Sequence, residues 1–148
     1  MMKLVDGDET IAVVLAHGLE AGHSDRVSAD ALVAAINARG AGHPWRRAIV
    51  VSDLAWMEAP LLHRAPCIAI GGPGVNAVAG QFVPELPTVW RDDERSLIQA
   101  ELGDGPRRAA LWGMDRAATT ESVRAFIARG WLDEFLDRCW RWRAGVLA

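Results

Sequence analysis

The stretch Cys67-Ile68-Ala69-Ile70-Gly71-Gly72-Pro73-Gly74-Val75-Asn76 decides which architecture this chain can adopt. A short apolar run bounded by glycine and proline is typical of a buried strand. The glycines allow a tight turn, and the residues after them are compatible with a helix. Such a turn brings the backbone close to a ligand, and the first N–H groups of a helix suit an anion. The stretch therefore predicts a strand–turn–helix unit that is also a candidate binding site.

The residues on both sides of this unit predict an alternating series of strands and helices. The continuous apolar run 10–16 indicates a strand covered on both faces, as in a parallel sheet. Residues 54–65 fit either a short helix or a packed loop broken at Pro60. The other predicted elements are strands at 46–51 and 108–112, a hairpin over 88–102, and helices at 28–39, 75–82, 119–130 and 131–142.

Capping residues define where two of these helices are expected to begin. Ser28 is a suitable N-cap, which leaves the polar residues from His17 to Asp25 as a predicted loop. Thr119 or Thr120 is the corresponding candidate for the helix that ends before Gly130.

Together these elements predict a single domain over residues 1–148 with a three-layer α/β fold. We expect a mostly parallel sheet with a hairpin insertion and C-terminal helices. Two strand orders fit the pattern. In a flavodoxin-like order the second and third strands lie on either side of the first, whereas a Rossmann-like order runs 3-2-1. The flavodoxin-like order places a switch point, where open sheets bind ligands, between the first and third strands.

Composition limits the classes of function. The chain has 148 residues, of which 51% are hydrophobic and 24% charged, with a net charge of −3. These values are typical of a globular domain and predict binding neither to nucleic acid nor to a membrane surface. No apolar run approaches the ~20 residues of a membrane span, and the N-terminus lacks the pattern of a signal peptide. We therefore expect a cytoplasmic protein.

Two further features of the composition concern cysteine and tryptophan. Cys67 and Cys139 both lie in apolar runs, and two cysteines do not indicate a disulfide framework. The chain has seven tryptophans and no tyrosine. Because tryptophan is enriched in grooves and subunit contacts, a homodimer is a plausible assembly.

The glycine turn gives the leading functional hypothesis, a binding module for a small anionic ligand or a partner. Gly71, Gly72, Gly74 and Asn76 are the predicted ligand-binding residues, since backbone N–H groups and a side-chain amide suit an anion. The stretch matches neither a P-loop nor the dinucleotide fingerprint G-x-G-x-x-G, so no cofactor is assigned. The alternative interpretation is that the glycines serve only the turn.

A hydrolase-type enzyme is the competing hypothesis. His17, His23 and Asp25 are the candidate catalytic residues because histidine and carboxylate side chains perform acid–base chemistry. Their spacing matches no zinc pattern, so no metal ligand is assigned, although metal-assisted hydrolysis is one version of the hypothesis. Asp53 and Asp115 follow other strands and are further candidates for the same cleft. No serine lies in a G-x-S-x-G motif.

Overall fold

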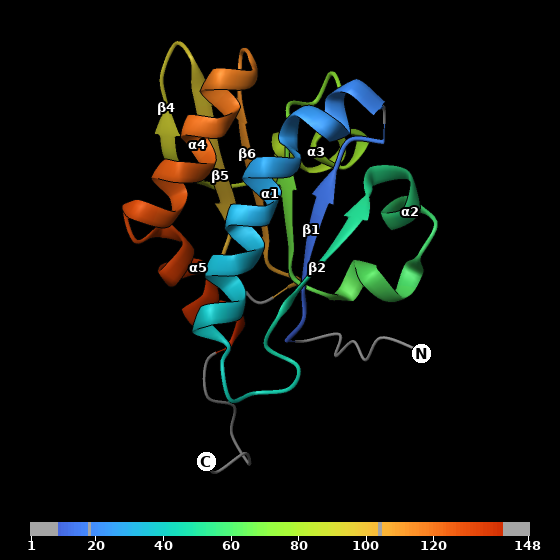
Figure 1. Ribbon diagram of the computed structural model, residues 1–148, viewed down its shortest axis with the longest axis vertical. Helices are drawn as coiled ribbons and strands as arrows, with labels where there is room; N and C mark the ends of the chain where they lie inside the picture. The colour runs from blue at the N-terminus through green and yellow to red at the C-terminus, as the bar shows by residue number, and fades with distance from the viewer. Residues whose placement is uncertain (1–8, 18, 104, 141–148) are drawn as a thin grey trace.

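The computed structural model describes residues 9–17, 19–103 and 105–140, with the side chains of residues 19–24 and 83 excepted. It shows an α/β fold built on a six-stranded sheet (Figure 1). In chain order the elements are β1 (Ile11–Leu15), α1 (Leu19–Arg39), β2 (Ala48–Ser52), α2 (Asp53–Met57), the 3-10 helix η1 (Pro60–Arg64), β3 (Cys67–Ile70), α3 (Ala77–Phe82), the 3-10 turn η2 (Val83–Glu85), β4 (Thr88–Asp92), β5 (Ser96–Glu101), β6 (Arg108–Gly113), α4 (Arg116–Ala128) and α5 (Trp131–Cys139).

The strand order is β2-β1-β3-β6-β5-β4. The first four strands in this order pair in parallel, whereas β6, β5 and β4 pair antiparallel. The predicted α/β class, the mostly parallel sheet and the hairpin are therefore confirmed. The 3-2-1 order is wrong because β1 lies between β2 and β3. The antiparallel β5 and β4 make the sheet mixed and separate it from an all-parallel flavodoxin-like sheet.

Helices cover both faces of the sheet, which makes three layers. Helices α1, α4 and α5 lie on one face, and α2 and α3 lie on the other (Figure 1). Successive residues of a strand point to opposite faces, so β1 contributes to both cores. Ile11 and Val13 pack beneath α1, while Ala12 and Val14 pack with α3. The apolar continuity of β1 thus follows from burial on both sides.

The structure corrects both predicted helix starts. Helix α1 begins at Leu19, so Ser28 is not its N-cap; the Ser28 hydroxyl instead donates to Thr120 Oγ1 on α4, at 3.4 Å. Packing of Leu32 and Ile36 on the sheet stabilises α1 well beyond what local propensity indicates. The N-cap of α4 is Asp115, whose carboxylate accepts from Ala118 N–H at 2.7 Å.

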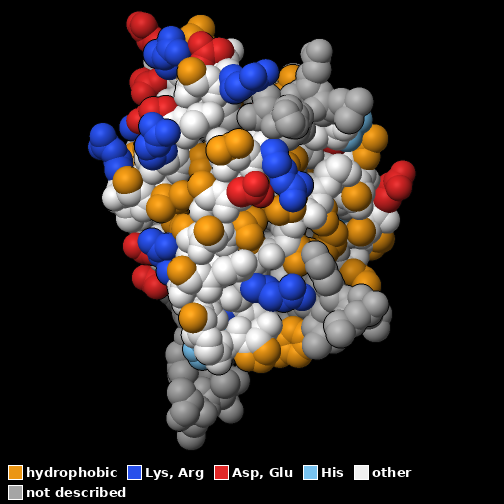
Figure 2. All heavy atoms as spheres, in the orientation of Figure 1, with side chains coloured by type: hydrophobic (Ala, Val, Ile, Leu, Met, Phe, Trp, Pro, Cys, Tyr) orange, Lys and Arg blue, Asp and Glu red, His pale blue; other side chains and the backbone are white. Residues whose placement is uncertain are grey.

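The surface over α1, α4 and α5 mixes charged and apolar side chains (Figure 2). Basic and acidic groups lie next to one another there, and Arg26 pairs with Asp30 one helical turn away. Among the helices of the described chain, none combines the length and apolar character needed to cross a bilayer.

Candidate functional site

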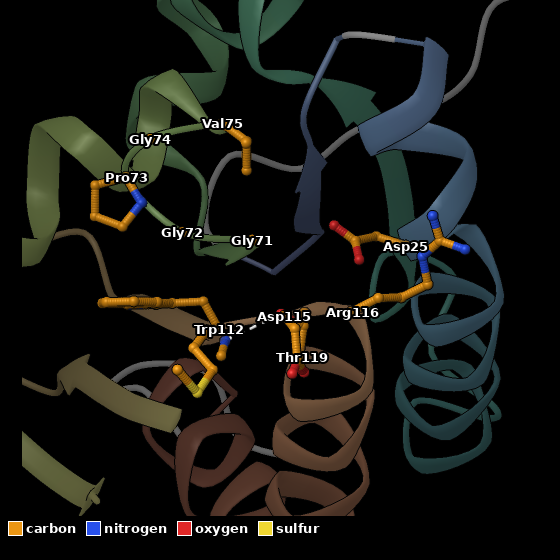
Figure 3. A pocket seen from close by; sticks show the side chains of 12 residues that line it. Asp25, Gly71, Gly72, Pro73, Gly74, Val75, Trp112, Asp115, Arg116 and Thr119 are labelled. Atoms are coloured by element: carbon orange, nitrogen blue, oxygen red, sulfur yellow. Dashed lines mark hydrogen bonds between the residues drawn. The ribbon is translucent and has the colours of Figure 1, made fainter. Parts of the chain in front are cut away.

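An open cavity of about 490 Å³ lies at the carboxyl ends of β3 and β6 (Figure 3). This is the edge of a parallel sheet at which ligands commonly bind, and the volume is in the range of small-molecule sites. We call it the Asp25 cavity. Its lining comes from α1, from the turn after β3, from the end of β6 and from the start of α4: Asp25, Gly71, Gly72, Pro73, Gly74, Val75, Trp112, Gly113, Met114, Asp115, Arg116 and Thr119.

The glycine turn (residues 71–76) forms one wall of the cavity. Its three glycines differ in how well each position would tolerate a side chain. Gly71 has φ = +108°, a conformation that side chains rarely adopt, and a Cβ there would lie 3.4 Å from Asp25 Oδ2. A Cβ on Gly72 would lie 3.2 Å from Trp112 Cε3. Gly74 has open space around its Cβ position and no positive φ. Local geometry therefore restricts Gly71 and Gly72, but not Gly74.

Asp25 faces this turn from helix α1. Its carboxyl group points into the cavity toward the turn (Figure 3). The residue is only 6% exposed, yet its side chain accepts no hydrogen bond from any described residue. Burial raises the pKa of Asp25, an effect that the positive charge of Arg116 partly opposes. A buried carboxyl group that accepts no hydrogen bond from the described residues and opens to a cavity is a candidate for contact with a ligand.

The opposite wall contributes one positive charge and apolar surface. The Asp115 carboxylate accepts hydrogen bonds from Ala118 N–H and from Arg95, whose Nη2 lies 3.1 Å from Asp115 Oδ2. The hydrogen bond from Ala118 and the charge of Arg95 lower the pKa of Asp115. Because Asp115 is paired with Arg95, its charge is already balanced. Arg116 supplies the positive charge among the described residues that line the cavity.

Two residues of the cavity lining have exposed apolar side chains. Val75 is 53% exposed and Met114 66% exposed. Both residues line the cavity, one from each wall. Apolar atoms in these positions favour contact with a ligand whose body is partly apolar.

Asn76 closes the glycine turn but does not line the cavity. Its Nδ2 donates to the carbonyl groups of Val14 and Ile70, at 3.1 and 3.0 Å. Its Oδ1 accepts from the N–H groups of Val78 and Ala79, at 3.0 and 3.2 Å. The side-chain amide is fully buried and its hydrogen-bonding capacity is filled. Asn76 therefore joins β1, β3 and α3 and caps that helix, which leaves no group for the ligand role predicted from the sequence.

His17 and Asp53 form a second polar cluster at the ends of β1 and β2. His17 Nδ1 lies 2.9 Å from Asp53 Oδ1, and their side chains are 51% and 0% exposed. Asp53 also accepts from Leu54 N–H and Ala77 N–H, both at 2.8 Å. Burial alone would raise the pKa of Asp53, but these three donors outweigh it and the pKa lies below its usual value.

The three residues of the hydrolase hypothesis are thus placed differently. His17 pairs with Asp53 and makes no described contact with Asp25, which lines the cavity. The side chain of His23 lies outside the described part of the chain. Among the residues that are described, no group of three histidine, cysteine, aspartate or glutamate side chains converges as metal ligands. Burial raises the pKa of the Cys67 thiol to about 12, which keeps it protonated and poorly nucleophilic.

Sequence reasoning missed the wall formed by Trp112, Arg116 and Thr119. The signal for it was present, because Trp112 ends the last predicted strand and Arg116 and Thr119 follow that strand. In a parallel sheet, the segment after each strand reaches the same edge. What the sequence does not reveal is that β6 is the neighbour of β3, which brings Trp112 against Gly72.

Comparison with protein-family models and with curated proteins finds no match to this chain. The function is therefore argued from the geometry of the site itself.

Proposed function

We propose that this protein is a binding module for a small anionic ligand that also carries a hydroxyl group, and that the ligand occupies the Asp25 cavity. Sugar phosphates and hydroxy acids are ligands of this class. The observation that carries the proposal is Asp25: the residue is only 6% exposed, and its carboxyl group is directed into an open cavity with no hydrogen bond from a described residue. Burial of a polar group in this state costs free energy, which a ligand hydroxyl would offset by donating to it.

The anionic end of the ligand is assigned to the part of the cavity between Arg116 and the glycine turn. Arg116 supplies a positive charge there, and Arg–anion hydrogen bonds are stronger than neutral ones. The N–H groups of Gly72 and Gly74 make no hydrogen bond to the rest of the described backbone. They are the donors of the glycine turn that remain for an anion, since the first N–H groups of α3 are bound by Asn76 and Asp53.

A thermal-shift screen of the dialysed protein tests the proposal. Sugar phosphates and hydroxy acids are expected to raise the Tm, because a ligand that binds only the folded state stabilises it. Matched compounds that lack either the hydroxyl or the anionic group should bind at least about tenfold more weakly, the effect of losing ~1.4 kcal/mol. Calorimetric titration of the best compounds gives the Kd.

Two pairs of variants assign the binding to this cavity. Gly74→Val adds bulk to the lining without strain, whereas Gly105→Val adds the same side chain in open space before β6, at the opposite end of that strand. Arg116→Gln removes the cavity cation, and Arg124→Gln removes an exposed arginine two turns later on α4. We expect the first variant of each pair to weaken binding at least tenfold and the second to leave it unchanged. Absence of stabilisation by every anion, with Gly74→Val equal to wild type, would contradict the proposal.

A further inference from the structure

The His17–Asp53 pair lies outside the Asp25 cavity and has the geometry of an oriented base. Asp53 is held by two backbone donors, Leu54 N–H and Ala77 N–H, so its position does not depend on His17. Because the pKa of Asp53 is lowered, the carboxylate is ionised near neutral pH and can only accept. His17 Nδ1 must therefore carry the proton in the 2.9 Å contact, so in the neutral imidazole Nε2 is the nitrogen with the lone pair.

The contact with Asp53 uses only one ring nitrogen of His17. The imidazole donates through Nδ1 to the buried carboxylate and helps to lower the pKa of Asp53. Nε2 has no hydrogen bond with any residue that the structure describes, and is free to meet solvent.

The two other histidines with described side chains differ from His17. His63 Nε2 lies 2.9 Å from the Trp56 carbonyl oxygen, and its ring stacks on Trp56 with centroids 4.1 Å apart. His43 is exposed and contacts no carboxylate among the described residues. Of these three, only His17 combines a buried carboxylate partner with an open ring nitrogen.

Two exposed apolar residues follow Asp53 on the same helix. Helix α2 starts at Asp53, and its residues Leu54 and Met57 are 48% and 43% exposed. Exposed apolar side chains gain free energy when an apolar group packs on them and removes them from water. An acyl group resting on α2 would lie on the helix that begins at the paired carboxylate.

We propose that His17 is the general base of a second site, distinct from the Asp25 cavity, that hydrolyses uncharged carboxylic esters, with Asp53 as its positioning residue. Nε2 takes a proton from water while the water oxygen bonds to the acyl carbon. The C–O bond to the leaving group then breaks, and Nε2–H returns the proton to the departing alkoxide. The products are one carboxylic acid and one alcohol, so the imidazole is regenerated without a further reactant.

Hydrolysis of p-nitrophenyl acetate by the full chain tests the role of His17. The nitrophenolate leaves as the anion, and Nε2–H then releases its proton to solvent water. His17→Ala is expected to lose about 10²-fold of the rate above background, the contribution of a positioned base. His43→Ala, which removes an exposed histidine without a carboxylate partner, should retain the wild-type rate. Added imidazole should restore hydrolysis to His17→Ala more than it accelerates wild type. Equal rates for the two alanine variants would overturn the proposal.

Asp53→Asn tests whether the rate depends on orientation of His17 by Asp53 or only on the presence of an exposed imidazole. An asparagine no longer fixes the proton on Nδ1, so the rate should fall more than tenfold while His17 is still present. The rate is measured at a temperature where circular dichroism shows the variant folded. An unchanged rate in folded Asp53→Asn would exclude Asp53 as a positioning residue. If the variant does not fold, the imidazole rescue of His17→Ala decides: rescue supports the base, and its absence overturns it.

Discussion

Asp53 and Asp25 are the same residue type, both buried near the carboxyl edge of one sheet, and they are in opposite electrostatic states. Asp53 accepts hydrogen bonds from His17, Leu54 and Ala77, and its pKa is lowered. Asp25 accepts none from the described residues, and burial raises its pKa. Burial itself disfavours a carboxylate in both places, so the difference lies in the donors.

One carboxylate holds elements of the fold together through hydrogen bonds. The other makes no hydrogen bond with a described residue and remains available to a ligand. The Asp53 carboxylate joins the end of β2 to the start of α3 and orients His17. The Asp25 carboxyl group lies beside Gly71 and opens to a cavity. A buried polar group that the protein does not satisfy is costly, which is why it indicates binding more strongly than a satisfied one.

Removing the charge of Asp53 is the change with the largest expected effect. Asp53→Asn replaces one acceptor oxygen by an NH₂ group that faces protein donors, so the free energy of unfolding should fall by about 3 kcal/mol. The lowered pKa means that the Asp53 contribution is present above about pH 4 and is lost as the pH falls through the folded-state pKa. Urea denaturation at pH 7 and at pH 3 checks both statements. If Asp53→Asn were as stable as wild type at pH 7, Asp53 would not stabilise the fold, and its predicted difference from Asp25 would be contradicted.

The same substitution at Asp25 should have the opposite sign. Asp25→Asn removes a carboxylate that burial destabilises, and the variant should gain on the order of 1 kcal/mol at neutral pH. Because the folded-state pKa of Asp25 is raised, this gain appears as the pH rises above about 4 and is absent at lower pH. Urea denaturation across pH 3 to 8 measures it. Loss of stability in Asp25→Asn at pH 7 would show that the fold does use this carboxyl group.

The smallest expected effect is at Gly74, in the glycine turn beside Asp25. Gly74→Ala should change the free energy of unfolding by less than about 0.5 kcal/mol, since its Cβ would meet open space. Gly71→Ala should cost roughly 1–3 kcal/mol because of its φ of +108° and its closeness to Asp25. Thermal unfolding of the two variants side by side measures the difference. Equal stabilities would show that Gly71 is not held in the left-handed conformation.

Much of the fold was predictable because the local sequence of its strands already shows a recognisable hydrophobic pattern. Burial of β1 and β3 on both faces requires continuous apolar runs, and residues 10–16 and 67–70 show them. The hairpin over residues 88–102 was predictable from a polar turn between two extended segments. The start of α1 was not, because Leu19 to Val27 carries a weak local helix signal and packing on the sheet extends the helix.

The candidate site was predictable only in part. Gly71, Gly72 and Gly74 line the cavity on the turn that the sequence indicates, and Asp25 lies across from them. Asn76 has the residue type that binds anions, yet its environment fills every hydrogen-bonding position. Residue type states which bonds a side chain can make, whereas the neighbours decide which bonds remain.

The sequence by itself therefore determined the strand–turn–helix unit at residues 67–82 and the α/β class, because both follow from local hydrophobic period and turn chemistry. Only the tertiary structure decided that β1 lies between β2 and β3 and that β6 lies beside β3. Those pairings join segments far apart in the chain, and they alone give Asp53 three donors and leave Asp25 with none among the described residues. Local patterns do not encode the strand order. Because of that order, Asp53 is a structural carboxylate, whereas Asp25, which has the same side chain, is a candidate ligand contact.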